Sequence, residues 1–359
     1  MNTNPKATLS LENGMKFYGE MFGDIKNIAG EVIFTTSMLG YQESFTDPSY
    51  AKQILVMTYP NIGNYGFNFD FEESEKILLN GIIVNEKCDN SNNSLSEMNF
   101  EAYLRQNKIT GLCNVDTRAL VLAIREYGNL RGAICLSETP AHEIKQMIDE
   151  FDDTNVIQEI STKNKYYISR KYKDITKIGL KIAVIDLGCK KSIINEFIKR
   201  ESEIVVFPFD ADFQEIRDEK PDLIFVSNGP GNPKNATKTI ETVNALIGKI
   251  NICGICMGHQ IIGLALGGDT SKLKFGHRGI NHPVKNLMNN KIYITSQNHN
   301  YFISNLPKKY IDITFQSIND GTIEGICSEK FMIKSVQFHP EASPGPLDVK
   351  FIFDDFQNI

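Results

Sequence analysis

The chain has 359 residues, which is enough for about two domains that each have a core. Its hydrophobic content of 41% and charged content of 23% are ordinary, and its net charge of −6 gives no electrostatic case for binding nucleic acid or an anionic membrane. No apolar run reaches transmembrane length, no signal-peptide stretch opens the chain, and seven cysteines without framework spacing favour a cytoplasmic protein.

Residues 1–151 have the pattern of a compact α+β domain that begins with strands. Strands are expected at 8–11, 16–20, 31–36, 53–58, 76–79 and 131–136. Helices are expected at 96–107, 116–127 and 140–151. The Asn13-Gly14 pair between the first two strands is typical of a hairpin turn. The polar segment 152–178 is interpreted as the connection to a second domain.

From 179 to 359 the pattern changes to alternating strands and helices. Strands are expected at 181–186, 203–208 and 222–227, and again before residue 254. Helices are expected at 189–200, 236–248 and, as a closing element, 347–356. Repeated strand–helix–strand units predict an α/β fold with a doubly wound, mostly parallel sheet covered on both faces. Ligands of such sheets bind beyond the carboxyl ends of the strands.

The sequence G-I-C-M-G-H-Q at 254–260 places Cys256 between an apolar strand and a helix. This is the pattern of a nucleophile elbow, with Cys in place of Ser. A thiol at a helix N-terminus favours the thiolate, which is the nucleophilic form. An ordinary buried Cys in a strand-to-helix turn is the alternative interpretation.

A Cys nucleophile needs a base, and His339 in Q-F-H-P-E at 337–341 is the best candidate. The side chains of His339 and Glu341 should lean to the same side, so the carboxylate can orient the imidazole. A loop-capping role for this segment is the alternative. His259, one helical turn after Cys256, is a rival base.

For the remaining histidines of the second domain, structural hydrogen bonding is the default expectation. They are His277, His282 and His299. No metal site is predicted, because no ligand spacing joins them to paired cysteines.

The predicted chemistry is acyl transfer, in which backbone N–H groups stabilise an oxyanion. Met257, the residue after the nucleophile, would supply one N–H group. Gly229 or Gly231, in the loop S-N-G-P-G-N-P at 227–233, could supply the other, although that loop could also be a plain tight turn.

These three motifs together resemble the class I (triad) glutamine amidotransferases. The resemblance implies that a triad of Cys256, His339 and Glu341 hydrolyses L-glutamine through a γ-glutamyl thioester and releases ammonia. It also implies a set of glutamine contacts: Gly229, Gly231, Met257, Gln260, Asn298, Asn300 and Tyr301. The family usually has Gly-Phe where this chain has Asn300-Tyr301, and Asn can replace Gly only if it adopts the backbone geometry that Gly allows. Because Asn tolerates a positive φ better than most residues, glutamine hydrolysis is expected to survive this change.

The first domain narrows the resemblance, which then covers nearly the whole chain. The segments T-D-P-S-Y at 46–50, T-Y-P-N-I-G-N at 58–64 and D-T-R-A-L at 116–120 are similar to small subunits of carbamoyl-phosphate synthetase. That family passes ammonia to a large subunit, where ATP and Mg are expected to act with bicarbonate, for pyrimidine and arginine biosynthesis. The chain itself would need no cofactor. Ser49 would reach glutamine from the first domain.

The sequence leaves three other functions open. Cys253 and Cys256 form a C-x-x-C pair, so a thiol–disulfide protein is conceivable, although Cys253 should be buried in the strand. A non-catalytic partner of a synthetase is a second possibility, and an amidotransferase that serves another synthetase is a third.

Overall fold

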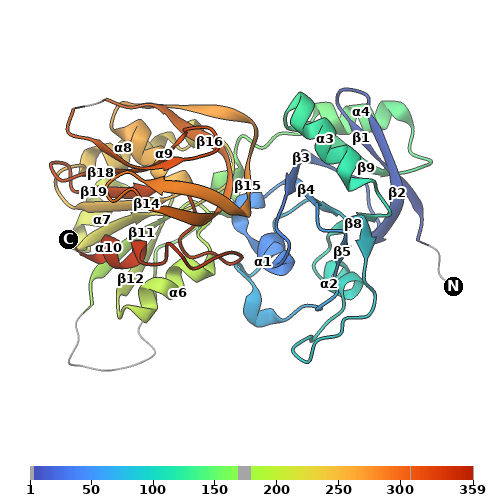
Figure 1. Cartoon of the computed structure of the whole chain (residues 1–359), viewed down its shortest axis with the longest axis horizontal. Coiled ribbons are helices and arrows are strands. Elements are labelled where there is room, and N and C mark those ends of the chain that lie inside the picture. Colours follow the sequence, from blue (N-terminus) through green and yellow to red (C-terminus); the bar gives the residue numbers. More distant parts are fainter. Residues whose placement is uncertain (1–3, 169–178, 308, 359) are drawn as a thin grey trace. The chain divides into compact units, whose positions relative to one another are not determined.

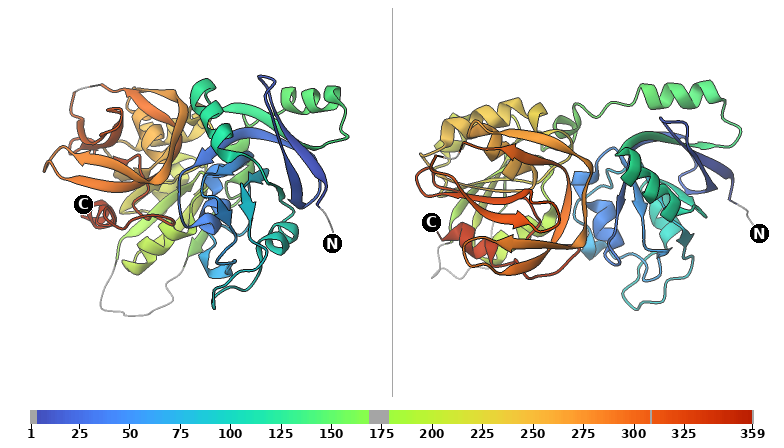
Figure 2. Two further views of the ribbon diagram at one scale, coloured as in Figure 1. Left: turned by 45° about the vertical axis from the view of Figure 1, so that its right-hand side comes forward. Right: turned by 45° about the horizontal axis from the view of Figure 1, so that its top comes forward.

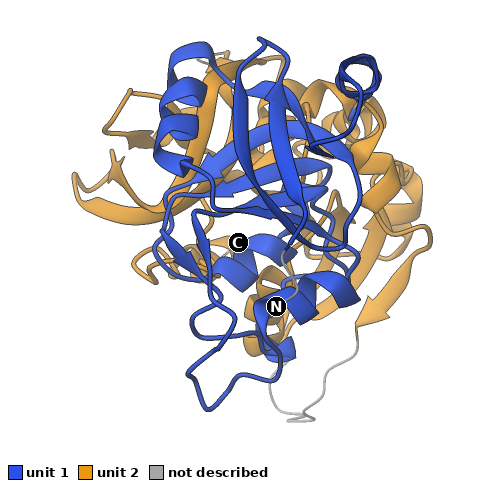
Figure 3. Ribbon diagram, turned by 90° about the vertical axis from the view of Figure 1, so that its right-hand side faces the viewer, with its two compact units in different colours: residues 1–153 blue, residues 154–359 orange. Residues whose placement is uncertain are grey.

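The computed structural model describes residues 4–168, 179–307 and 309–358. The chain forms two compact units, residues 1–153 and 154–359 (Figure 3). The predicted connection at 152–178 therefore falls mainly in the second unit. It contains helix α5 (Val156–Ile160) and strand β10 (Tyr166–Ile168), and its residues 169–178 lie outside the described part of the chain.

The first unit is built on a closed barrel with the strand order β1-β2-β8-β6-β4-β3-β9 (Figure 1). Its strands are β1 (Lys6–Leu11), β2 (Lys16–Gly23), β3 (Ile28–Thr35), β4 (Gln53–Met57), β6 (Gly81–Ile83), β8 (Thr110–Cys113) and β9 (Leu130–Leu136). The expected hairpin joins β1 and β2, with Gly14 at a φ of 89°. Closure leaves this barrel without an exposed strand edge.

Short helices and a small sheet complete the first unit. They are α1 (Tyr41–Thr46), α2 (Phe100–Gln106), α3 (Thr117–Tyr127), α4 (Ala141–Asp149), and the pair β5 (Asn61–Ile62) and β7 (Glu86–Lys87). Helix α3 begins after Asp116, whose side chain accepts a hydrogen bond from the Ala119 N–H group. The aromatic ring of Phe100 packs on that of Phe45 at a centroid distance of 5.8 Å.

The strand predicted at 76–79 is wrong. The chain there is irregular, and the strand β6 begins only at Gly81. Leu78 and Asn80 are instead held by hydrogen bonds to distant segments: the Leu78 carbonyl accepts from the Lys52 N–H group, and the Asn80 side chain donates to the Ala29 carbonyl. Apolar residues in this stretch fill the core without joining the ladder.

The second unit holds a sheet of ten strands in the order β10-β12-β11-β13-β14-β19-β18-β17-β15-β16. Its central strands run parallel: β11 (Lys181–Asp186), β12 (Glu203–Pro208), β13 (Leu223–Val226), β14 (Asn251–Ile255) and β19 (Ile333–Val336). An antiparallel extension follows: β15 (Asp269–Asn286), β16 (Ile292–Asn305), β17 (Asp312–Ser317) and β18 (Ile323–Ser328). The predicted α/β fold with a parallel sheet is confirmed for the five central strands, and the antiparallel strands make the ten-stranded sheet mixed.

Helices cover both faces of this sheet. They are α6 (Lys191–Lys199), α7 (Phe213–Asp218), α8 (Thr237–Leu246), α9 (Met257–Ala265) and α10 (Ile352–Gln357). On one face Phe197 of α6 packs edge-on against Phe225 and Phe353. Helices α8 and α9 lie on the opposite face, as Figures 1 and 2 show. The doubly wound arrangement is therefore confirmed.

Candidate active site

Cys256 lies in a strained turn between β14 and α9. Its φ of 55° and ψ of −105° fall in a region that non-glycine residues rarely adopt. The thiol is buried, with 2% of the residue exposed, and Sγ lies 3.5 Å from the Asn298 carbonyl oxygen. The Cys256 N–H group donates to the Val336 carbonyl of β19 at 2.9 Å. Backbone pairing therefore fixes the elbow beside the neighbouring strand.

Two glycines allow α9 to approach the sheet at this elbow. A Cβ on Gly258 would lie 2.0 Å from the Val226 carbonyl oxygen, and one on Gly254 would lie 2.8 Å from the Gly258 backbone. Neither position has room for a side chain. The G-x-C-x-G spacing is thus required by the close contact of the helix with β13 and β14.

His339 follows β19 and is held next to Glu341. Nδ1 of His339 lies 2.6 Å from Oε1 of Glu341, and the His339 N–H group donates to the Ser296 carbonyl at 2.9 Å. A carboxylate only accepts, so Nδ1 carries the proton of the ring. Among the described residues Nε2 has no hydrogen-bond partner, which leaves this nitrogen for Cys256 and substrate.

The charges of this pair are coupled to the thiol. Burial opposes a charged imidazole, but Glu341 and then Cys256 outweigh burial and raise the pKa of His339 to about 10. Burial likewise opposes a charged carboxylate, yet Lys190 and His339 lower the pKa of Glu341 to about 2. At neutral pH the site therefore holds an imidazolium beside a carboxylate.

Lys190 is a functional residue that the sequence interpretation missed. It is buried, and its Nζ donates to Oε1 of Glu341 at 3.0 Å and to the carbonyls of Ala342 at 2.7 Å and Ser343 at 3.0 Å. In the sequence it precedes α6 as the first of two lysines, a pattern typical of a solvated helix start. No local signal distinguishes it, because its partners lie about 150 positions away.

The loop after β13 begins next to the elbow, since Val226 pairs with Gly254. Gly231 has a φ of 85°, and a Cβ on Gly229 would lie 2.2 Å from the Leu187 carbonyl oxygen. Both glycines are therefore required by the backbone. Met257 opens α9, and its N–H group is among those that α-helices leave without an intrahelical acceptor. This placement fits an oxyanion site, which stays a prediction.

Most of the expected glutamine contacts gather at the same edge of the sheet. Nε2 of Gln260 donates to the Tyr301 carbonyl at 2.6 Å and to Oε1 of Gln337 at 3.1 Å. Asn300 remains within the extended strand β16, with no positive φ, and its Oδ1 accepts a hydrogen bond from the Arg278 guanidinium. Asn300 therefore has an ordinary strand backbone here, and its contact with glutamine stays a prediction.

Ser49 lies in the first unit, where it is buried in a 3₁₀ turn at Pro48–Tyr50 and its N–H group donates to Oδ1 of Asp47 at 2.9 Å. Its contact with glutamine stays a prediction.

The two rival interpretations of neighbouring residues find no geometric support. Nδ1 of His259 lies 2.9 Å from Oγ of Ser335, and burial lowers its pKa to about 3, so the ring is neutral and turned toward β19. Cys253 is 1% exposed, and burial raises the pKa of its thiol. A buried, protonated thiol is unsuited to disulfide exchange.

Known families match both units. The carbamoyl-phosphate synthase small chain domain matches residues 9–134, and the class-I glutamine amidotransferase family matches residues 183–359. The carbamoyl phosphate synthase small chain of Clostridium perfringens is 48% identical over 98% of this chain and 98% of its own length. The same-named protein of Caldanaerobacter subterraneus is 48% identical over 99% of this chain and 96% of its own.

The chain belongs to the carbamoyl phosphate synthase small chain family. The predicted family is confirmed, and with it the prediction of an enzyme, the glutamine amidotransferase component of a ligase. The barrel unit is the small-chain domain of this family, and the sheet unit is its amidotransferase domain. In the ranges 4–168, 179–307 and 309–358, no helix is long and apolar enough to cross a bilayer.

Proposed function

We propose that the chain hydrolyses the side-chain amide of L-glutamine and delivers ammonia to a carbamoyl-phosphate synthetase large subunit. The observation that carries this proposal is the 2.6 Å contact of His339 with Glu341 beside the strained Cys256 elbow. Family membership supports the large subunit as the partner.

In the first half-reaction the Cys256 thiolate attacks the amide carbon of glutamine. The negative charge moves to the carbonyl oxygen, where the Met257 N–H group and that of Gly229 or Gly231 stabilise it. The His339 imidazolium gives its proton to the leaving nitrogen, the C–N bond breaks, and ammonia departs. A γ-glutamyl thioester remains on Cys256.

In the second half-reaction the now neutral imidazole of His339 takes a proton from water, which attacks the thioester. Collapse of the tetrahedral intermediate releases glutamate and restores the thiolate, and the proton stays on His339. Glu341 and Lys190 hold the ring in one tautomer through both steps. Gln260, Asn298, Asn300, Tyr301 and Ser49 would orient the glutamine.

The large subunit would use the ammonia with bicarbonate and ATP, with Mg²⁺ on that subunit, to make carbamoyl phosphate for pyrimidine and arginine biosynthesis. The hydrolytic steps themselves need no cofactor in this chain. The seven cysteines, all within the described residues, form no disulfide, which supports a cytoplasmic location.

The test is release of ammonia from glutamine by the chain alone and with the large subunit, together with acid trapping of a glutamine-derived thioester. We expect the wild type to form the thioester on Cys256 and the large subunit to raise the rate. Absence of a complex and of any stimulation would refute the assignment to carbamoyl-phosphate synthesis. Absence of the thioester under turnover would refute the mechanism.

A further inference from the structure

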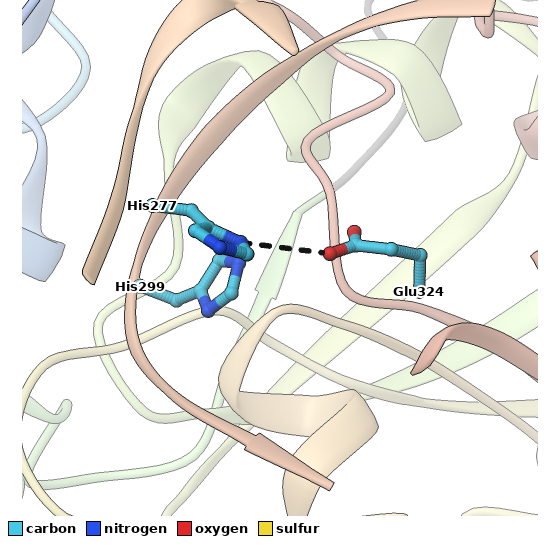
Figure 4. A group of neighbouring side chains, drawn as sticks. All are labelled: His277, His299 and Glu324. Atoms are coloured by element: carbon cyan, nitrogen blue, oxygen red, sulfur yellow. Dashed lines mark ion pairs between the residues drawn. The ribbon is translucent and has the colours of Figure 1, made fainter. Parts of the chain in front are cut away.

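Three side chains from the antiparallel part of the second unit meet within the sheet, and none of them belongs to the proposed triad. They are His277 on β15, His299 on β16 and Glu324 on β18, and one ligand atom from each lies within 4.8 Å of the others. Figure 4 shows both imidazole rings side by side and facing the carboxylate. His277 and His299 are direct partners in the strand register, with ring centroids 5.0 Å apart. The sheet therefore holds the group on a rigid scaffold.

Outer partners fix the tautomer of His277. Its Nε2 lies 2.8 Å from Oδ2 of Asp320, and a carboxylate only accepts, so Nε2 carries the proton of a neutral ring. The lone pair is then on Nδ1, which is buried and has no hydrogen-bond partner within the described ranges. Nδ1 lies 3.8 Å from Oε1 of Glu324, which is itself fully buried.

Both ring nitrogens of His299 face oxygens that only accept, so a neutral ring can donate to just one of them. Nδ1 lies 2.8 Å from the Tyr301 carbonyl, and Nε2 lies 3.0 Å from Oε1 of Gln297, whose amide group is oriented by donation from its Nε2 to Oε2 of Glu324 at 2.8 Å. The neutral ring thus presents a lone pair to an oxygen that cannot donate.

One ring nitrogen of each histidine and one carboxylate oxygen of Glu324 lie within 4.8 Å of one another, an arrangement that a bound cation would stabilise. Two His and one Glu form a familiar ligand set for zinc, with a fourth position left for water. Metal-bound histidines usually donate their second N–H group to a carboxylate or a backbone carbonyl, as His277 does to Asp320 and His299 can do to Tyr301. Tetrahedral zinc places its ligand atoms about 3.4 Å apart, so the 3.8 Å between His277 and Glu324 needs only a small contraction.

We propose that His277, His299 and Glu324 bind one divalent transition-metal ion, with Zn²⁺ as the best match, and that Asp320 orients His277. The ion would tie β15, β16 and β18 together at the strand that carries Asn298 and Asn300. The site takes no part in the proposed hydrolysis, so either proposal can fail without the other.

The test uses the full chain with Cys256→Ser, which removes the thiol of the elbow as a competing ligand. The protein is freed of metal with a chelator and titrated with Zn²⁺ against a chromophoric indicator. We expect one Zn²⁺ per chain. Binding should weaken at least ~100-fold in His277→Asn and in Glu324→Gln, and about 10–100-fold in Asp320→Asn, which keeps all three ligands. His142→Gln removes an exposed histidine of the first unit and should leave the affinity unchanged.

Circular dichroism shows whether each variant folds. X-ray absorption of the zinc-loaded Cys256→Ser protein identifies the ligand atoms of the ion directly, without any further variant. Nitrogen and oxygen ligands at about 2.0–2.1 Å with two imidazoles are expected, whereas a sulfur shell at about 2.3 Å would overturn the assignment. Binding far below one ion per chain, or equal binding by folded His277→Asn and Asp320→Asn, would also overturn it.

Discussion

Nζ of Lys190 lies 3.0 Å from Oε1 of Glu341, and the two side chains are 3% and 0% exposed. The same carboxylate oxygen is 2.6 Å from His339, so one buried cation and one imidazole share it. Lys190 thus influences the orientation of His339, the proposed base, through Glu341.

Replacement of Lys190 by Met should impair both stability and glutamine hydrolysis. Removal of one partner of a buried ion pair leaves an uncompensated charge and costs about 3–5 kcal/mol of unfolding free energy. The carboxylate of Glu341 would then take up a proton more readily and hold His339 less firmly. Denaturant unfolding and the rate of ammonia release measure the two effects. Lys191→Met, at the exposed neighbour, should change neither, and equal effects of both variants would contradict the argument.

The stabilising effect of His339 should depend on pH in a defined direction. Its pKa is raised to about 10 in the folded chain, so its charged form stabilises the fold fully below the ordinary value of about 6.5 and loses this effect as pH rises through about 10. The difference in unfolding free energy between wild type and His339→Gln should therefore shrink from about pH 7 to 10. A difference that is constant or grows over this range would contradict the prediction.

The two cysteines of the C-x-x-C pair should respond differently to Ser substitution. Cys256→Ser should lower glutamine hydrolysis by at least ~10³-fold, since loss of a triad nucleophile removes most catalysis. Cys253→Ser should keep most of the rate, although a hydroxyl buried in the core costs about 1–3 kcal/mol of stability. Rates of ammonia release and thermal unfolding test both statements. Equal loss of activity in the two variants would restore the redox interpretation.

Gly258→Ala should destabilise the protein and displace the elbow. The added Cβ meets the Val226 backbone at 2.0 Å, and overpacking of this kind costs about 1–3 kcal/mol or more. Gly248→Ala is the matched control, because Gly248 has a φ of 71° but open space around its Cβ position. The control should show only the cost of its left-handed backbone, about 1 kcal/mol, and no loss of rate. Similar loss of activity in both variants would exclude the close contact as the cause.

The parallel sheet and the elbow could be predicted from sequence because their signals are local. Apolar strands such as β11 and the glycines around Cys256 are determined by residues within a few positions. The pairing of His339 with Glu341 could be predicted for the same reason, since they lie two residues apart. Features of this kind depend little on contacts with distant parts of the chain.

The remaining features depend on contacts between distant residues. Barrel closure in the first unit requires β1 to pair with β9, and no short segment signals it. The contacts of Lys190 form only when separate loops come together in the fold. The same holds for the group of His277, His299 and Glu324, which come from separate strands. Arg278 likewise reaches the Asn300 side chain from the neighbouring strand, a contact that no local pattern indicates.

The hydrogen bond from the Cys256 N–H group to the Val336 carbonyl determines how heating should inactivate the enzyme. The nucleophile directly follows β14 and the base follows the adjacent strand β19, and the backbone N–H groups of both residues bond to neighbouring strands, at Val336 and Ser296. Local opening cannot loosen this pair without breaking central ladder bonds. The Cys256 amide should therefore exchange its hydrogen as slowly as the most protected core amides, and heat should abolish activity and sheet structure in a single step.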